Sequence, residues 1–257
     1  MDKVANVLIL AGQREGVVDP LCAQAGIDRK ALLPFNGMPM IDYVLAALRR
    51  ATVADAFYVS GFDASYHSDL IQSPSKPGPA GSAMAAIEAG IDVPLLITTA
   101  DHPLLTAEMI DIFITGAKKT GADFCVGLAE KNVIAPAYPN MKRTYLKFSD
   151  IAVSGCNLFY VANENGIEAI RFWQQAQNDR KKPWKLAWRL GLGGLLKYVS
   201  GRLSFDDAFS QVSKTLGITA RPVLIPIAEA AIDVDKPSDK TLVEAILLAR
   251  KQAKAVS

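Results

Sequence analysis

A glycine and two basic residues follow the first apolar segment of the chain. The segment ends in Leu10-Ala11-Gly12-Gln13, and Arg14 and Lys30 come after it. A glycine directly after a strand lets the backbone approach a phosphate closely, and exposed N–H groups there can hold an anion. Arg14 and Lys30 add positive charges that would offset a triphosphate and stabilise charge growing at a transferred phosphorus. The pattern predicts a phosphate site, although a strand-ending loop with solvated charges would explain each residue alone.

A second segment rich in proline and glycine has similar properties. It reads Pro77-Gly78-Pro79-Ala80-Gly81-Ser82 and leads into a helix expected at 82–89. Its glycines permit close backbone approach, and Gly81, Ser82 and the helix N-terminus offer donors to a base, ribose or phosphate. The alternative is a plain turn in which Ser82 caps the helix.

Aspartates in two distant parts of the chain could hold a divalent cation. Asp101 ends an apolar segment, where its hard carboxylate oxygens would suit Mg²⁺; the alternative is a helix- or turn-capping aspartate. Asp233 and Asp235 lie two residues apart, so on the strand expected at 231–233 they would project to one face. Paired carboxylates are costly without a cation, which favours an ion between them. Asp235 could instead cap the last helix, and Asp239 is expected in that helix's first turn.

Apolar segments and helical periodicity predict the elements that position these residues. Strands are expected at 4–11, 54–60, 94–99, 124–128, 144–148, 157–161, 223–225 and 231–233. Helices are expected at 40–50, 82–89, 106–119, 164–177, 184–199, 204–216 and 238–251, and Thr106 can cap the third of them. Their alternation predicts an α/β fold, a three-layer α/β/α sandwich with a mostly parallel mixed sheet. Gly12 and Asp101 both follow strands, so they are candidates for one crevice at the carboxyl ends.

We expect residues 1–257 to form a single domain with a helical basic and aromatic insertion at about 163–216. Within it, segment 171–202 carries basic side chains and one acid, Asp179, with aromatic residues among them. Its basic residues are Arg171, Arg180, Lys181, Lys182, Lys185, Arg189, Lys197 and Arg202, and the tryptophans and tyrosine among them are Trp173, Trp184, Trp188 and Tyr198. This segment could lie on anionic lipid, cover a phosphorylated acceptor, or pack on its own domain with a solvated basic side.

Composition narrows the classes of function. The formal net charge of +2 gives no polyanion signature, so we expect no nucleic-acid partner. The three cysteines form no CxxC pair and the chain has two histidines, so we expect free thiols and no zinc site. The N-terminal apolar run is too short for a signal peptide, and no run reaches the ~20 residues of a membrane span, so we expect a cytoplasmic protein.

Taken together and in order, these segments resemble the MobA-like NTP transferases, which include the molybdenum-cofactor guanylyl- and cytidylyltransferases. The matches are Leu10-Ala-Gly12, Lys30-Ala-Leu-Leu33 and Gly37-Met-Pro39, and the similar segments are 77–82, 97–103 and 233–239. The resemblance covers about residues 4–128 and 223–250. Gln13 stands where the family has a second glycine, and the loop between Arg14 and Lys30 is longer than usual.

The resemblance implies a GT-A-like fold and a nucleotidyltransferase that moves NMP from an NTP to a phosphorylated small molecule and releases pyrophosphate. It implies that Lys30, Arg14 and Asp101 are catalytic, and that Asp101 and Asp235, with Asp233 as a third carboxylate, bind Mg²⁺. It assigns nucleotide contacts to Leu10, Ala11, Gly12, Gln13, Gly78, Pro79, Gly81 and Ser82. Gly155 and Asn157 resemble a segment that related enzymes place in the acceptor pocket; a glycine-preceded strand entry is the alternative.

Two other functions fit the same pattern. A glycosyltransferase of this fold class would use an NDP-sugar, but such enzymes usually carry Asp-x-Asp after a central strand. Here the corresponding residues are Thr99-Ala-Asp101, with one carboxylate. A catalytically inactive regulator would bind an NTP without turnover.

Overall fold

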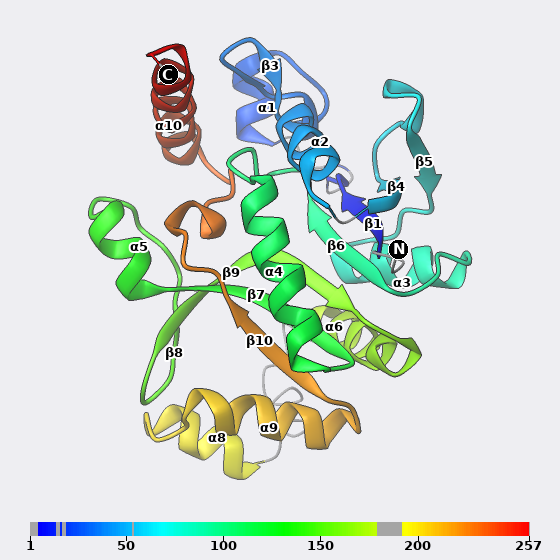
Figure 1. Ribbon diagram of the computed structural model, residues 1–257, viewed down its shortest axis with the longest axis vertical. Coiled ribbons are helices and arrows are strands. Elements are labelled where there is room, and N and C mark those ends of the chain that lie inside the picture. The colour runs from blue at the N-terminus through cyan, green and yellow to red at the C-terminus, as the bar shows by residue number, and fades with distance from the viewer. Residues whose placement is uncertain (1–4, 14–15, 17–18, 53, 179–191, 257) are drawn as a thin grey trace.

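The computed structural model describes residues 5–13, 16, 19–52, 54–178 and 192–256 (Figure 1). Its centre is an eight-stranded sheet in the order β10-β7-β9-β6-β1-β4-β5, with β8 paired to β9. The strands are β1 (Ala5–Leu10), β4 (Ala54–Ser60), β5 (Leu70–Ser73), β6 (Leu95–Thr99), β7 (Phe124–Glu130), β8 (Leu146–Lys147), β9 (Ala152–Val161) and β10 (Ala220–Leu224). A separate hairpin joins β2 (Pro34–Phe35) to β3 (Met38–Pro39).

The sheet is mixed and mostly parallel, as the sequence predicts. Strand β1 runs parallel to β4 and β6, β4 runs parallel to β5, and β10 runs parallel to β7. Strand β9 lies between β6 and β7 and runs antiparallel to both. The first residues of β9 also pair antiparallel with β8. Because β1 and β6 are parallel neighbours, Gly12 and Asp101 leave the sheet at the same edge.

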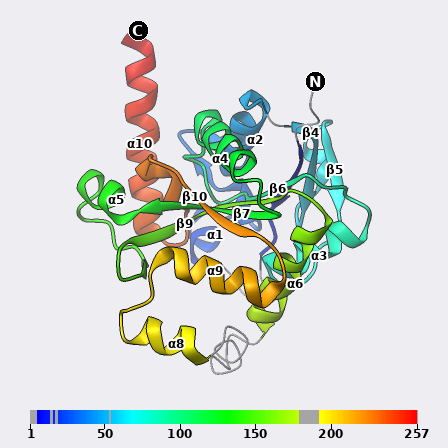
Figure 2. The ribbon, with the colours of Figure 1, turned by 60° about the horizontal axis from the view of Figure 1, so that its bottom comes forward.

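Helices cover both faces of the sheet, which gives the three layers (Figure 2). On one face, α2 (Met40–Arg50) and α4 (Ala107–Thr120) bury apolar residues such as Leu45 and Phe113 against the sheet. On the other face lie α3 (Pro79–Glu88), α6 (Ile167–Asn178) and α9 (Phe205–Leu216). The α/β/α prediction is therefore confirmed.

Further short helices and one long C-terminal helix complete the described part of the chain. They are α1 (Pro20–Ala25), α5 (Lys131–Ala137), α8 (Leu192–Val199) and α10 (Pro237–Val256), with single 3₁₀ turns at η1 (Lys30–Leu32), η2 (Ala64–Tyr66), η3 (Glu164–Gly166) and η4 (Ala228–Ala231). Helices α1 and α10 share an apolar cluster with the β2–β3 hairpin that includes Leu21, Phe35 and Val243. None of the helices in the described ranges is long and apolar enough to cross a bilayer.

Local sequence accounts for several helix ends. Thr106 accepts a hydrogen bond from the N–H of Met109 and so caps α4, as predicted, and Gly121 ends the helix in the left-handed conformation. Asp19 caps α1 in the same way, followed by Pro20 in the first turn. The long loop expected between Arg14 and Lys30 therefore contains a short helix, because this cap and proline start one there.

Two other expectations fail for identifiable reasons. The strand at 231–233 is wrong, because the chain there leaves the 3₁₀ turn η4 and pairs with no strand in the described part of the chain. Ile232 and Val234 are buried against α1 and α10, so their apolar alternation reflects packing on helices. The helix expected to start at Ser82 begins at Pro79, with Gly78 as its N-cap residue.

The basic and aromatic segment 171–202 is described only in part, because residues 179–191 lie outside the described ranges. Trp173 packs on the core, with its ring 4.7 Å from that of Phe159. The side chains of Lys197 and Tyr198 are exposed. The peripheral membrane contact and the division into one domain with an insertion stay predictions; the former is tested by co-sedimentation with anionic vesicles.

The three cysteines are free, and Cys22, Cys125 and Cys156 are all buried. Burial raises the pKa of each thiol, that of Cys156 to about 12. Because the thiolate is the reactive form, we expect none of the three to react quickly with a disulfide reagent at about pH 8 in the native protein. All three should react after unfolding in guanidinium. Fast labelling of Cys156 in folded protein would contradict its burial.

Candidate active site

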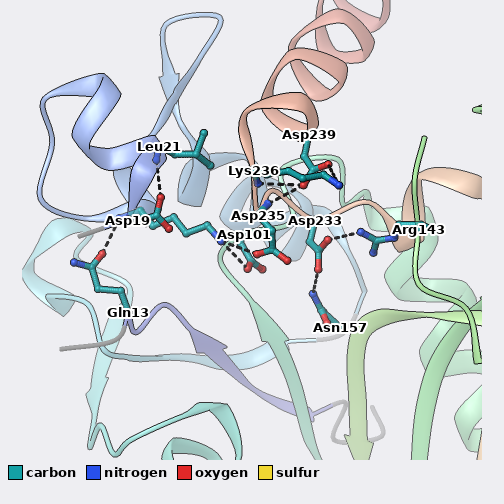
Figure 3. A network of polar contacts seen from close by, with 11 residues as sticks. Gln13, Asp19, Leu21, Asp101, Arg143, Asn157, Asp233, Asp235, Lys236 and Asp239 are labelled. Atoms are coloured by element: carbon teal, nitrogen blue, oxygen red, sulfur yellow. Dashed lines mark hydrogen bonds and ion pairs between the residues drawn. The ribbon is translucent and has the colours of Figure 1, made fainter. Parts of the chain in front are cut away.

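Lys30, Asp101 and Asp235 meet at the carboxyl edge of the sheet. Figure 3 shows the two aspartates side by side. The Nζ atom of Lys30 lies 3.4 Å from Oδ2 of Asp101 and 3.0 Å from Oδ1 of Asp235. Lys30 and Asp101 are mostly buried, whereas Asp235 is mostly exposed. The predicted convergence of two distant aspartates opposite Lys30 is therefore present.

Backbone hydrogen bonds hold the two aspartates together. Asp101 follows β6, and its carbonyl oxygen accepts a hydrogen bond of 2.9 Å from the N–H of Val234. The side chain of Asp239 accepts hydrogen bonds from the N–H groups of Asp235 and Lys236. Asp239 thus fixes the turn that enters α10, in the first helical turn where the sequence places it.

The glycine loop after β1 passes close to the loop after β4. Gly61 has a φ of +79°, and a Cβ there would lie 2.3 Å from the Cα of Gly12. The Gln13 side chain accepts a hydrogen bond from the Lys30 N–H and donates one to the Asp28 carbonyl. Gln13 therefore fixes the backbone of the segment that carries Lys30. The sequence predicted only a nucleotide contact for Gln13.

These residues line a pocket of about 320 Å³, the size range of small-molecule sites. Its lining residues are Leu10, Ala11, Gly12, Gln13, Asp19, Pro20, Lys30, Ala31, Met40, Ala100, Asp101 and Asp235. The pocket unites the predicted glycine loop with the lysine and two of the predicted metal aspartates. Sequence reasoning missed Asp19, whose position before Pro20 is a helix-cap signal.

The charges in the pocket depend on one another. Burial works against the charged form of Lys30, but Asp101 and Asp235 raise its pKa above the usual value, so the ammonium stays charged. Burial raises the pKa of the Asp101 carboxyl, and Lys30 partly offsets this effect. A second cation near Asp101 would further stabilise its charged form.

The donor set suits Mg²⁺ bound together with a phosphate. Asp101 Oδ1 is buried and has no hydrogen-bond partner of normal geometry among the described residues, although buried carboxylate oxygens are usually paired. Nor does the described part of the chain arrange three or more His, Cys, Asp or Glu side chains as a complete metal site. Mg²⁺ commonly takes one or two carboxylates and fills its other positions with water and substrate phosphates, so Asp101 and Asp235 fit it.

Asp233 has different partners from Asp235. Its Oδ1 lies 2.5 Å from Nη1 of Arg143, and its Oδ2 accepts a hydrogen bond of 3.2 Å from Asn157. The sequence predicted one strand face for Asp233 and Asp235, which is wrong because these residues belong to none of the described strands. The structure brings Asn157 to this cluster, while Gly155 on β9 is exposed with open space beside it.

The segment 77–82 lies outside the lining of the pocket. The Ser82 hydroxyl exchanges hydrogen bonds with the backbone N–H and carbonyl of Lys76, and Gly81 sits in the first turn of α3. The Gln177 amide contacts the same segment, accepting from the Ala80 N–H and donating to the Pro77 carbonyl. Nucleotide contacts by Gly78, Pro79, Gly81 and Ser82 stay predictions, and Arg14 lies outside the described residues.

The sequence and fold of this chain are similar to those of known transferases. A family profile described as the MobA-like NTP transferase domain matches residues 21–152. A hypothetical transferase structure from Thermus thermophilus is 27% identical over 91% of this chain and 98% of its own, with a TM-score of 0.77. A comparison with curated proteins gave no match.

Two more distant structures share the fold. One is CMP:2-keto-3-deoxy-manno-octonic acid synthetase complexed with CTP, 11% identical over 95% of this chain and 98% of that one, with a TM-score of 0.59. The other is 2-C-methyl-D-erythritol 4-phosphate cytidylyltransferase from Thermus thermophilus, 16% identical with the same coverage and a TM-score of 0.52.

The fold is GT-A-like, and the protein is a nucleotidyltransferase. It belongs to the MobA-like NTP transferase domain family.

Proposed function

We propose that this protein transfers an NMP unit from an NTP to a phosphorylated small molecule, with Mg²⁺, and releases pyrophosphate. The observation that carries the proposal is the position of Lys30 between Asp101 and Asp235 beside the Gly12 loop. A basic residue, two carboxylates and a glycine loop at one strand edge supply what a metal-bound triphosphate requires.

In this proposal the pocket residues position the triphosphate and no protein nucleophile is needed. The Gly12 loop receives phosphate oxygens on its N–H groups, and Lys30 stabilises the negative charge that develops at the α-phosphorus. Asp101 and Asp235 hold Mg²⁺, which supplies charge neutralisation of the phosphate oxygens when bound. An acceptor oxygen forms a bond to the α-phosphorus, and the bond from that phosphorus to the pyrophosphate oxygen breaks.

Two features support this assignment over an NDP-sugar transferase. Lys30 forms ion pairs with the carboxylates of Asp101 and Asp235. Its pKa is raised, so the ammonium is charged where a triphosphate would sit. The strand end offers one carboxylate, Asp101, and the second comes from Asp235 in the distant turn before α10. The named CTP-using and cytidylyltransferase structures share this fold, which agrees with an NTP as donor.

The proposal is tested by assaying pyrophosphate from a matrix of ATP, CTP, GTP and UTP against phosphorylated small molecules with Mg²⁺. We expect one NTP and one class of acceptor to give pyrophosphate, and the product to contain the NMP unit. The Asp101→Asn protein should give no measurable product above background. Product from an NDP-sugar without pyrophosphate would favour the glycosyltransferase, and NTP binding without turnover for any acceptor would favour the inactive regulator.

A further inference from the structure

Arg143 forms a polar cluster beside the metal aspartates that no motif in the sequence marks. The segment before β8 carries it, and its Nη1 atom lies 2.5 Å from Oδ1 of Asp233. Asn157, on β9, holds the other oxygen of the same carboxylate. Asn157 has a backbone φ of +53°, a left-handed conformation that is uncommon in residues other than glycine, although asparagine adopts it more readily than most. Arg143 and Asn157, from two distant segments, thus meet at the Asp233 carboxylate of a third.

The guanidinium of Arg143 is anchored by Asp233 but has hydrogen-bond donors left over. Among the described residues, the guanidinium has one hydrogen-bond partner, Asp233, which Nη1 contacts. The Nε atom is buried and has no partner there. A guanidinium has five N–H donors in a planar fork that matches the oxygens of a phosphate. Buried donors without partners are uncommon, so a ligand oxygen is a natural partner for this one.

The cluster lies on the acceptor side of the proposed reaction. Figure 3 shows Asp233 and Arg143 on the side of Asp101 and Asp235 that faces away from Gln13 and Asp19. Attack on a phosphorus proceeds with the entering and leaving oxygens roughly in line. If pyrophosphate leaves toward the Gly12 loop and Lys30, the acceptor enters from the side of Arg143.

The charges around the aspartates also favour an acceptor phosphate beside Arg143. An acceptor phosphate that approaches Asp101, Asp233 and Asp235 meets carboxylates, and Lys30 is already shared by two of them. The Asp233 carboxylate pairs with Arg143 through one oxygen and accepts a hydrogen bond from Asn157 through the other, which anchors the guanidinium. A phosphate on the acceptor therefore needs a cation on this side, and Arg143 provides one.

We propose, on the basis of the proposed function, that Arg143 binds the phosphate of the acceptor. In this arrangement Asp233 is a positioning residue that holds Arg143 together with Asn157, and it is not a ligand of the metal. The substrate class is a phosphate monoester whose phosphate enters opposite the departing pyrophosphate. Asp101 and Asp235 are then the protein ligands of Mg²⁺.

The first test titrates inorganic phosphate, by calorimetry, into full-length protein saturated with Mg²⁺ and an α,β-methylene NTP analogue. The analogue fills the pyrophosphate side, so added phosphate reports the acceptor side. We expect Arg143→Ala to weaken phosphate binding about 10- to 100-fold and Arg143→Lys to weaken it less, because one charge-assisted bond is worth this much. The matched control Lys142→Ala, at an exposed neighbouring residue, should bind phosphate like the wild type.

Each outcome of the titration bears on the proposal. Equal phosphate binding by Arg143→Ala and the wild type, in variants that melt cooperatively, overturns it, as does absence of phosphate binding to the wild type. If Arg143→Ala does not fold, Arg143→Lys still decides, since it retains a charge beside Asp233 but loses the fork. If the analogue itself does not bind, the proposed function fails, and titration of the nucleotide-free protein then tests Arg143 separately.

The second test separates positioning from metal binding. Mn²⁺ binding in the presence of the analogue is measured by electron paramagnetic resonance for Asp233→Asn and Asp101→Asn. We expect Asp233→Asn to keep the Mn²⁺ affinity of the wild type while its phosphate affinity falls, and Asp101→Asn to lose Mn²⁺ affinity. Loss of Mn²⁺ affinity in Asp233→Asn comparable to that in Asp101→Asn, or unchanged phosphate affinity, overturns the role of Asp233.

Discussion

Lys30→Ala and Asp101→Asn should each lower turnover by about 10²- to 10³-fold or more while the protein stays folded. The Nζ atom of Lys30 lies within 3.4 Å of both carboxylates, so its removal takes away the positive charge nearest the proposed phosphorus position. Asp101→Asn removes the carboxylate whose Oδ1 has no hydrogen-bond partner of normal geometry among the described residues. The measurement is the steady-state rate of pyrophosphate release at saturating NTP and acceptor.

Two control substitutions distinguish site chemistry from charge. Lys142→Ala and Asp92→Asn change an exposed lysine and an exposed aspartate outside the pocket, and both should keep kcat within about 2-fold of the wild type. Circular dichroism and thermal melting check that all variants fold. A folded Asp101→Asn protein with near-normal turnover would remove Asp101 from the mechanism.

Gly61→Ala should damage both stability and nucleotide binding. A Cβ at Gly61 would lie 2.3 Å from the Cα and 2.6 Å from the N of Gly12, and the φ of Gly61 is +79°. Backbone cannot move aside as a flexible side chain does, so the Gly12 loop must shift. We expect a loss of about 2–4 kcal/mol of unfolding free energy, combining strained φ with forced displacement. NTP affinity should fall at least about 10-fold, because the backbone N–H groups of the Gly12 loop are proposed to bind the phosphates of the NTP.

Gly90→Ala is the matched control for Gly61→Ala. Gly90 has a φ of +95° and no atom within 4 Å of the position of its Cβ, so only the backbone conformation is strained. We expect Gly90→Ala to cost about 1–2 kcal/mol and leave NTP affinity unchanged. Guanidinium unfolding and a calorimetric titration with the NTP measure both quantities. Equal NTP affinity for Gly61→Ala and Gly90→Ala would show that the Gly12 loop does not hold the nucleotide.

Local patterns predicted the central sheet well. The strand at 54–60 and the Thr106 cap agree with the structure, because continuous apolar runs and capping residues carry local physical signals. The strand at 231–233 did not form, because apolar alternation there serves burial against α1 and α10 rather than pairing. Short apolar segments cannot tell these two environments apart.

The candidate site was predictable only in its motif residues. Lys30, Asp101 and Asp235 follow strands or turns whose order resembles the family, and the structure brings them together. Arg143 could not be found from sequence, because its partner Asp233 is 90 positions away and no local pattern marks either contact. A pairing of this kind depends on the fold that brings the segment before β8 and the turn before α10 together.

The most direct test of the site is anomalous diffraction from a crystal of the protein with Mn²⁺ and an α,β-methylene NTP analogue. The account predicts one metal peak bound by the carboxylates of Asp101 and Asp235, with triphosphate oxygens on the N–H groups of the Gly12 loop and on Lys30 Nζ. A metal bound elsewhere, with Asp101 and Asp235 out of contact with it and with the phosphates, would contradict the account.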